Sequence, residues 1–132
     1  MAHMSRLGTI VFDCKNENLD KAASFWAGAL GLVAEPEVAG YPNYRNMVGP
    51  DREPKMLLQN VEHEPRVHID IETDDKDAEC ARLQSLGAHI VNRVDEPGKD
   101  WIIMEAPTGH RLCLVKPQRA DFEENANRWG EE

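Results

Sequence analysis

The sequence predicts an α+β fold made of two similar halves, each with a strand, a helix and three further strands. Apolar and polar residues alternate from Leu7 to Cys14, and Leu19–Leu30 then shows apolar residues at helical spacing. The same succession returns with the alternation over Val67–Glu72 and the helical segment Lys76–Leu86. One helix on one sheet face is too little to close a core, so the two halves are expected to form a single domain.

The two halves can be superimposed along the chain. Leu30 precedes a glycine, and so does Leu86, 56 positions later, whereas Thr9 and His68 lie 59 positions apart. A longer first loop accounts for the difference of three residues. We therefore expect one domain over 4–117 whose modules cover about 7–62 and 66–117.

The first helix has the clearest boundaries. Asn18 is a favourable N-cap before it, and Gly31 stands at the usual C-terminal stop. Proline and glycine interrupt the segment 33–48, which predicts short strands, and a strand is expected over 55–61 after the turn 49–51. Further short strands are expected over 89–94, 101–105 and 111–116.

Composition excludes several classes of partner. Lysine and arginine number 15 against 24 acidic residues, a net charge of −9 with no basic run, which argues against nucleic acid and anionic membranes as partners. No apolar run reaches the roughly 20 residues that cross a bilayer. Residues 1–3 resemble a vector remnant before a natural start at Met4. The scattered Cys14, Cys80 and Cys113 predict reduced, structural thiols and a cytoplasmic protein.

The segment 118–132 is polar and acidic, yet Phe122, Ala126 and Trp129 lie at positions i, i+4 and i+7. One interpretation is a short terminal helix that packs this stripe on the domain or on a second subunit. The other is a frayed, solvated tail.

Four motifs follow one another over about residues 7–117. They are Ala22-Ala23-Ser24-Phe25-Trp26 ending at Leu30-Gly31, Val67-His68-Ile69-Asp70-Ile71, Leu83-x-x-Leu86-Gly87-Ala88, and Ala106-Pro107-Thr108-Gly109-His110-Arg111-Leu112-Cys113-Leu114. In this order they resemble the vicinal oxygen chelate superfamily, which includes glyoxalase I, bleomycin-resistance and fosfomycin-resistance proteins and extradiol dioxygenases. In the family the last motif usually reads Asp-Pro-x-Gly-Asn, from which Ala106 and His110 depart.

The resemblance implies a cupped, eight-stranded mixed sheet with the helices on its convex face and a ligand cleft on the other. It also implies a homodimer. Strand parity then separates two sets of side chains. Ile10, Phe12, Val67, Ile69 and Ile71 are expected under the helices, and Thr9, Val11, Asp13, His68, Asp70 and Glu72 in the cleft.

Metal-dependent members of the superfamily place a ligand on the first and the last strand of each half. Carried over, these positions fall on Thr9 and near Gln59 in the first half and on His68 and Cys113 in the second. His68 and Gln59 would be suitable ligands, whereas a threonine hydroxyl is a weak donor and a thiolate suits zinc or copper(I). A divalent metal is therefore weakly supported, and the cofactor is left unknown.

The predicted ligand-binding side chains would line the cleft. His68 could be a structural partner of Asp70 or Asp13, an orienting donor or a general base. Asp70 and Glu72 could form an acidic surface for a cationic or polyhydroxylated guest, or be solvated carboxylates. Trp101 could stack on a planar ligand, whereas Trp26 is expected in the core and His63 on the surface. The full set is Thr9, Asp13, Gln59, His68, Asp70, Glu72, Trp101 and Cys113.

Three functions remain open at this point. The first is metal-independent binding of a small organic molecule in an acidic cleft. The second is a metal-dependent enzyme of lyase, isomerase or dioxygenase type that uses His68 and Gln59. The third is a metal-free enzyme in which His68 acts as acid or base. The fold cannot decide among them, because such scaffolds carry many chemistries.

Overall fold

The computed structural model describes residues 2–15, 18–50 and 53–130. Met1, the turn residue Asp51 and the last two residues of the tail therefore lie outside the described part. The α+β prediction is confirmed: nine strands and three helices form in the described residues, in the order expected for two β-α-β-β-β modules. No described helix is long and apolar enough to span a bilayer.

The chain folds as two compact units. The first unit is Thr9–His68, and the second is Met1–Gly8 together with Ile69–Glu132. Strands β1 (His3–Lys15) and β5 (Arg66–Thr73) each contribute residues to both units. The boundaries of the two units therefore lie within these two strands.

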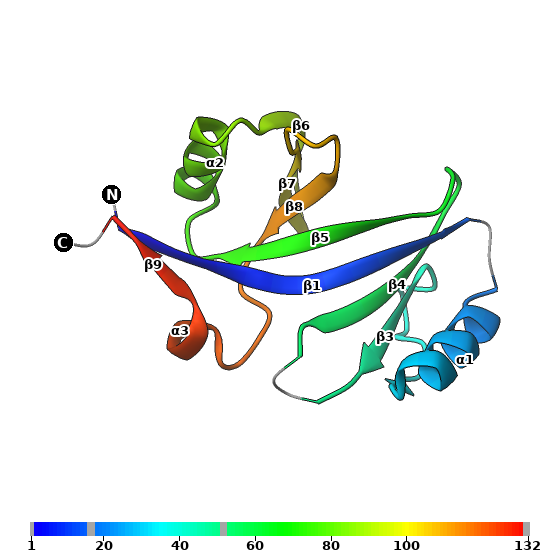
Figure 1. Cartoon of the computed structure of the whole chain (residues 1–132). Helices are drawn as coiled ribbons and strands as arrows, with labels where there is room; N and C mark the ends of the chain where they lie inside the picture. Colours follow the sequence, from blue (N-terminus) through cyan, green and yellow to red (C-terminus); the bar gives the residue numbers. More distant parts are fainter. Residues whose placement is uncertain (1, 16–17, 51–52, 131–132) are drawn as a thin grey trace. The chain divides into compact units, whose positions relative to one another are not determined.

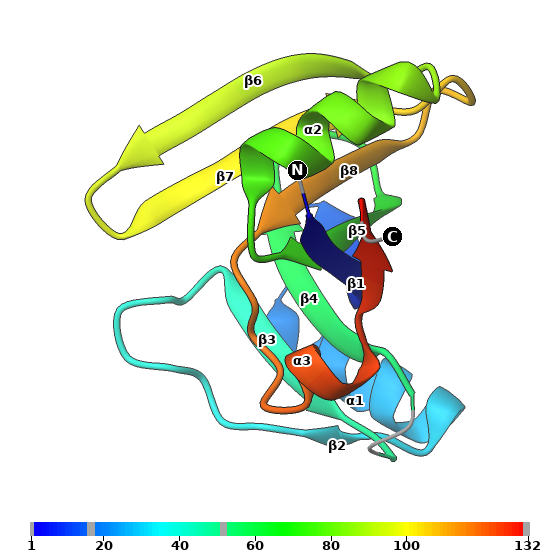
Figure 2. The same cartoon turned by 90° about the vertical axis from the view of Figure 1, so that its left-hand side faces the viewer.

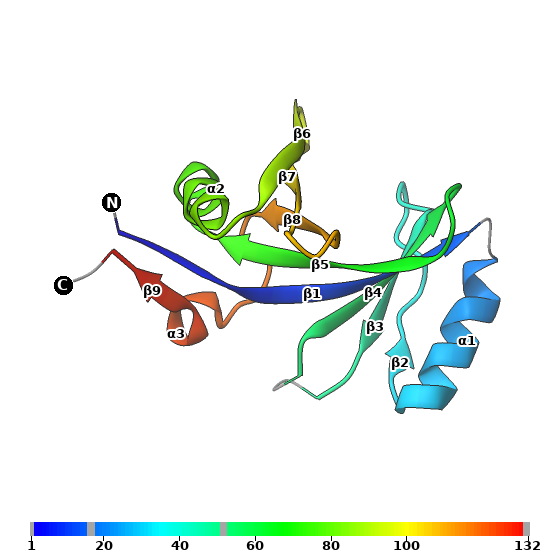
Figure 3. The same cartoon turned by 45° about the horizontal axis from the view of Figure 1, so that its top comes forward.

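The first unit is a small mixed sheet covered by one helix. Its strands lie in the order β2-β3-β4-β1, in which β1 and β4 are parallel and the other pairs antiparallel. Helix α1 packs along β2, β3 and β4, as Figures 1 and 3 show. Besides β1, the elements are α1 (Leu19–Leu30), β2 (Val33–Ala34), β3 (Tyr44–Val48) and β4 (Lys55–Val61).

Helix α1 begins and ends at the predicted residues for local reasons. The side chain of Asn18 accepts a hydrogen bond from the backbone N–H of Asp20 at 2.9 Å, and Gly31 ends the helix with a φ of 70°. The helix buries Leu19 and Ala23 against Met47, Met56 and Leu58 of the sheet. Phe12 and Cys14 of β1 pack on this core, so the predicted orientation of Phe12 is confirmed.

The second unit repeats the plan. Its strands lie in the order β5-β8-β7-β6, with β5 and β8 parallel, and Figure 2 shows α2 lying along this sheet. Asp75 caps α2 by accepting from the N–H of Ala78 at 3.0 Å. The elements are β5, α2 (Lys76–Ser85), β6 (His89–Glu96), β7 (Lys99–Glu105) and β8 (Arg111–Val115).

The core of the second unit lies between α2 and its sheet. Cys80 of α2 packs with Met104 and Leu114, and Ile69 and Ile71 of β5 lie against this cluster as parity predicts. The prediction is wrong for Val67, which is 48% exposed. Val67 lies at the start of β5, in the part of the strand that belongs to the first unit, where α2 provides no cover.

The tail contains a short helix, which one interpretation expected, and a strand that neither interpretation expected. Phe122–Asn125 form the short helix α3, and Asn127–Trp129 form strand β9, which pairs antiparallel with His3–Ser5 of β1. Phe122 is buried, but the backbone of Ala126 is extended, with ψ at 149°, so no single helix carries the stripe. The tail is thus a helix followed by a strand.

A buried carboxylate joins the chain ends to α2 within the second unit. Glu79 is fully buried, and Arg82 donates to both of its oxygens at 2.8 Å, while the His3 ring nitrogen lies 2.8 Å from one of them. Burial would raise the pKa of Glu79, but hydrogen bonds from Arg82, His3 and Ser5 outweigh it and lower the pKa below its usual 4.5. The Arg82 guanidinium also lies 3.9 Å over the ring of Trp129.

Candidate ligand-binding site

A buried carboxylate surrounded by basic side chains lies at the end of β1 in the first unit. The side chain of Asp13 is only 2% exposed, and its Oδ2 lies 3.0 Å from Nδ1 of His68. The same oxygen lies 3.7 Å from Nε of Arg66 and 3.9 Å from Nε2 of His63. Among the described residues, Oδ1 of Asp13 has no hydrogen-bond partner. Asp13 is therefore an anchor for His68 rather than part of an open acidic surface.

Strand register brings two further polar side chains beside Asp13. Gln59 of β4 is the direct partner of Asp13, and Tyr44 of β3 is the direct partner of Gln59. Nε2 of Gln59 donates to the Tyr44 hydroxyl at 3.4 Å. Directly paired residues share one face of a sheet, so Asp13, Gln59 and His68, all predicted from the sequence, gather with Tyr44. Thr9 is buried four residues earlier on β1, about 13 Å away along the strand.

Register also decides which residues occupy equivalent places in the two modules. In the second unit Cys113 pairs with Asp70. The offset of 59 residues between the modules makes Val11 the equivalent of Asp70, and Val11 pairs with Leu57. The first-module counterpart of Cys113 is therefore Leu57, two residues before Gln59. A leucine cannot bind a metal, and the suggested metal role of Gln59 stays a prediction without support from this register.

A pocket of about 560 Å³ opens in the first unit beside this cluster. Phe12 meets Trp26 edge to face with ring centres 4.5 Å apart, and Phe25 meets Trp26 in the same way at 5.0 Å. Phe25 is 63% exposed although it is large and apolar. The apolar lining consists of Phe12, Ala22, Phe25, Trp26, Pro65 and Val67, and the remaining lining residues are Asp13, Cys14, Lys15, Lys21 and Arg66.

Sequence reasoning missed most of this pocket. Trp26 packs on the core as predicted, but it also forms a pocket wall. One signal was present: neighbouring helical residues point about 100° apart, so Phe25 and Trp26 cannot both face the core. The positions of His63 and Arg66 carried no such signal, because their approach to Asp13 depends on how β5 meets the end of β1.

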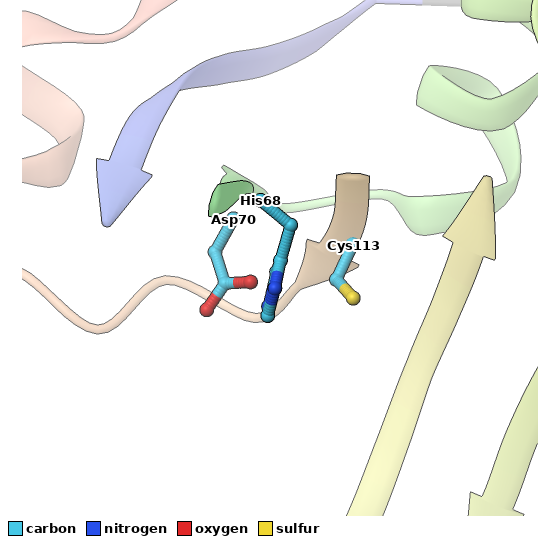
Figure 4. A group of neighbouring side chains, drawn as sticks. All are labelled: His68, Asp70 and Cys113. Carbon is cyan, nitrogen blue, oxygen red and sulfur yellow. The ribbon is translucent and has the colours of Figure 1, made fainter. Parts of the chain in front are cut away.

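The remaining predicted side chains lie on β5, β7 and β8. His68 and Asp70 are two residues apart on β5, and Asp70 is the register partner of Cys113 on β8 (Figure 4). Their candidate ligand atoms, one per residue, lie within 4.8 Å of one another. An imidazole, a carboxylate and a thiolate together suit zinc better than magnesium or manganese. Trp101 is half-buried on β7 and does not line the pocket.

Glu72 corrects one of the interpretations made from the sequence. It is fully buried, so it is not a solvated carboxylate at a strand end. Its Oε1 accepts from the backbone N–H of Arg119 at 3.3 Å, and Gly8 lies so close that a Cβ there would come within 2.5 Å of Cγ of Glu72. Glu72 therefore belongs to the interior of the second unit.

A comparison with protein-family models matches residues 9–115 to the glyoxalase-like domain, which covers most of the chain. The chain belongs to this family. It is thereby a member of the vicinal oxygen chelate superfamily, as its motifs indicated. No curated protein sequence matches it.

Solved structures similar to this glyoxalase-like chain show the same fold. Methylmalonyl-CoA epimerase from Mycobacterium tuberculosis matches with a TM-score of 0.57 and 20% identity over 86% of this chain and 88% of the epimerase. A hypothetical protein from Bacillus halodurans matches with a TM-score of 0.58 and 15% identity over 87% and 97%. A variant of homoprotocatechuate 2,3-dioxygenase from B. fuscum matches with a TM-score of 0.58 and 18% identity over 86% of this chain and 32% of the enzyme. At these identities the likeness concerns the fold alone.

Proposed function

We propose that this glyoxalase-like protein binds a small organic molecule with a flat, apolar body in the pocket of the first unit, without a metal. The observation that carries the proposal is the exposed aromatic wall of that pocket. Ligand pockets usually measure about 300–1,000 Å³ and have mostly apolar, aromatic walls with a few polar groups. The volume of about 560 Å³ and the three aromatic rings of Phe12, Phe25 and Trp26 meet both conditions.

Independence from metal follows from the residues at the family's ligand positions. Thr9 is a weak donor, and Leu57 stands where register puts the counterpart of Cys113. Only His68 and Cys113 remain of the four positions. The Asp13–His68 pair then orients an imidazole: with a proton on Nδ1 donated to Asp13, the basic lone pair lies on Nε2. The same pair would serve acid–base chemistry in a metal-free reaction.

The test uses 2-naphthamide, a neutral flat probe, and the three indole N–H signals of the protein in nuclear magnetic resonance spectra. We expect the indole signal of Trp26 to shift on titration, those of Trp101 and Trp129 to stay, and EDTA to change nothing. Phe25→Ala should weaken binding several-fold, because it removes one wall. Leu86→Ala, at an apolar side chain 64% exposed in the second unit, is the matched control. A Trp26 signal that does not move at millimolar probe would contradict the proposal.

A second candidate function is favoured by the donors on β5 and β8. His68, Asp70 and Cys113 would hold a zinc ion, which as a Lewis acid polarises a substrate oxygen. Asp13 would keep the ring of His68 oriented, a common arrangement behind metal-binding histidines. Purified protein that retains about one equivalent of zinc, and loses it in Cys113→Ser, would favour this candidate. A zinc content below about a tenth of an equivalent, with no rise in melting temperature on adding zinc, would reject it.

We also propose a cytoplasmic location and a homodimer. Cys14, Cys80 and Cys113 are reduced thiols, and such thiols persist in a reducing compartment. The first unit exposes Phe25, Leu30 and Val33 by 63%, 53% and 67%, which is much apolar surface for a monomer. Sedimentation equilibrium at micromolar concentration should give about twice the chain mass of 14.9 kDa, and a monomer at this concentration would contradict the dimer.

A further inference from the structure

We propose that the ligand of the first-unit pocket is an organic anion, whose carboxylate or sulfonate group is held by Lys21 and Arg66 while its flat body lies on the aromatic wall. This inference rests on the proposed binding function and adds the chemical class of the ligand. It differs from the expectation that Asp70 and Glu72 form an acidic surface for a cationic or polyhydroxylated guest.

The charged side chains of the described pocket lining are mostly cationic, although the chain is acidic. The chain carries a net charge of −9, yet the charged residues among the described pocket lining are Lys15, Lys21, Arg66 and Asp13. The Asp13 carboxylate is buried, and its Oδ2 lies 3.7 Å from Nε of Arg66, which offsets part of its charge. A local potential of this sign attracts anions even on an acidic protein.

The three cations differ in how they are engaged. The Lys15 ammonium contacts the carboxylate of Glu64, which neutralises it. Arg66 is 49% exposed, its Nε lies 3.7 Å from Asp13, too far for a hydrogen bond, and its Nη2 donates one hydrogen bond to Nε2 of His63 at 3.3 Å, which leaves Nη1 and the second Nη2 hydrogen. Its guanidinium therefore keeps donors for a carboxylate, which it can bind with two parallel hydrogen bonds.

Lys21 is placed to act together with the aromatic wall. It precedes Phe25 by four residues in α1, so the two side chains share one face of the helix, and both line the pocket. An anionic group near Lys21 therefore puts an attached ring beside Phe25 and Trp26. This combination selects a flat molecule with its charge at one end.

The experiment compares three ligands that share one ring system: 2-naphthoate, 2-naphthamide and 2-naphthylmethylammonium. We expect the anion to bind about three to ten times more tightly than the amide, and the cation to bind most weakly. This preference should shrink at about 0.5 M salt, because ions screen exposed charges. Lys21→Gln and Arg66→Gln should each reduce the ratio of the affinity for the anion to that for the amide.

The controls separate this inference from the proposed function. Lys55→Gln, at an exposed lysine of β4 outside the pocket, should keep the full preference, and thermal melting verifies that each variant is folded. If the amide shifts the Trp26 signal and binds as tightly as the anion, the anion inference is wrong and the binding function stands. If none of the three ligands shifts that signal, both are wrong. A preference that survives both pocket substitutions also overturns the inference.

Discussion

Removing Arg82 should destabilise the protein strongly, because it leaves a buried carboxylate without its main partner. Both oxygens of Glu79 accept from Arg82 at 2.8 Å, and the Glu79 side chain is 0% exposed. Breaking one side of a buried ion pair costs about 3–5 kcal/mol, and the contact over the ring of Trp129 adds about 0.5–1 kcal/mol. Because Arg82 itself is 26% exposed, we expect the lower end, about 3 kcal/mol for Arg82→Ala.

Thermal and urea denaturation measure this loss. About 3 kcal/mol corresponds to a fall in melting temperature of roughly 10 °C in a domain of this size. Arg93→Ala is the matched control: Arg93 pairs with Asp77, and the two side chains are 51% and 83% exposed, so the change should cost less than about 1 kcal/mol. Replacing both Glu79 and Arg82 by leucine should recover part of the loss, since no buried charge is then left alone.

The reasoning would be refuted if Arg82→Ala and Arg93→Ala lowered stability by equal amounts. That result would mean that His3 and Ser5 satisfy Glu79 by themselves. A loss that the double leucine variant does not reduce at all would instead assign the effect of Arg82 to packing rather than to charge.

The remaining predictions concern acid, a close approach and a buried thiol. The pKa of Glu79 is lowered in the folded state, so its contribution to stability is complete above the unfolded value near 4.5 and is lost as the pH falls through the folded pKa. Glu79→Gln should therefore make the free energy of unfolding depend less on pH in acid. A pH dependence equal to that of the wild type would contradict this. Gly8→Ala should cost about 1–3 kcal/mol, because its Cβ would lie 2.5 Å from Cγ of the buried Glu72. Gly28→Ala, in α1 with nothing within 4 Å, should be neutral or stabilise by up to about 1 kcal/mol, and equal effects at the two glycines would reject the clash. Burial raises the pKa of the Cys80 thiol, so iodoacetamide should modify it more slowly than the other two cysteines, as peptide mass spectrometry can measure.

Elements with local determinants were predictable from the sequence. The bounds of α1 match because the caps act locally: Asn18 accepts from the backbone N–H two residues later, and Gly31 donates to the carbonyl four residues earlier. The start of β1 was placed too late, at Leu7, because residues 3–5 become a strand by pairing with residues 127–129. A local sequence pattern cannot predict pairing with a strand more than 120 residues away.

The tail shows the same limit of local sequence patterns. Phe122 and Trp129 have the spacing of one helical face, and the structure buries Phe122 fully and Trp129 partly. They do so from two different elements, since Trp129 donates its indole N–H to Ser5 at 2.9 Å from strand β9. Apolar spacing thus predicted which side chains pack but not the backbone that presents them.

For the site, parity was the effective part of the sequence reasoning. Alternation along β1 and β5 put Asp13 and His68 on one face, where they meet at 3.0 Å. The net charge of −9 says little about a pocket, because net charge averages over the whole surface, whereas a ligand responds to the few groups within a Debye length of about 8–10 Å. Among the described residues that line the pocket, those groups include Lys21 and Arg66. The charge of a binding site must therefore be derived from the side chains that line it, and our proposal of an organic anion rests on these two cations.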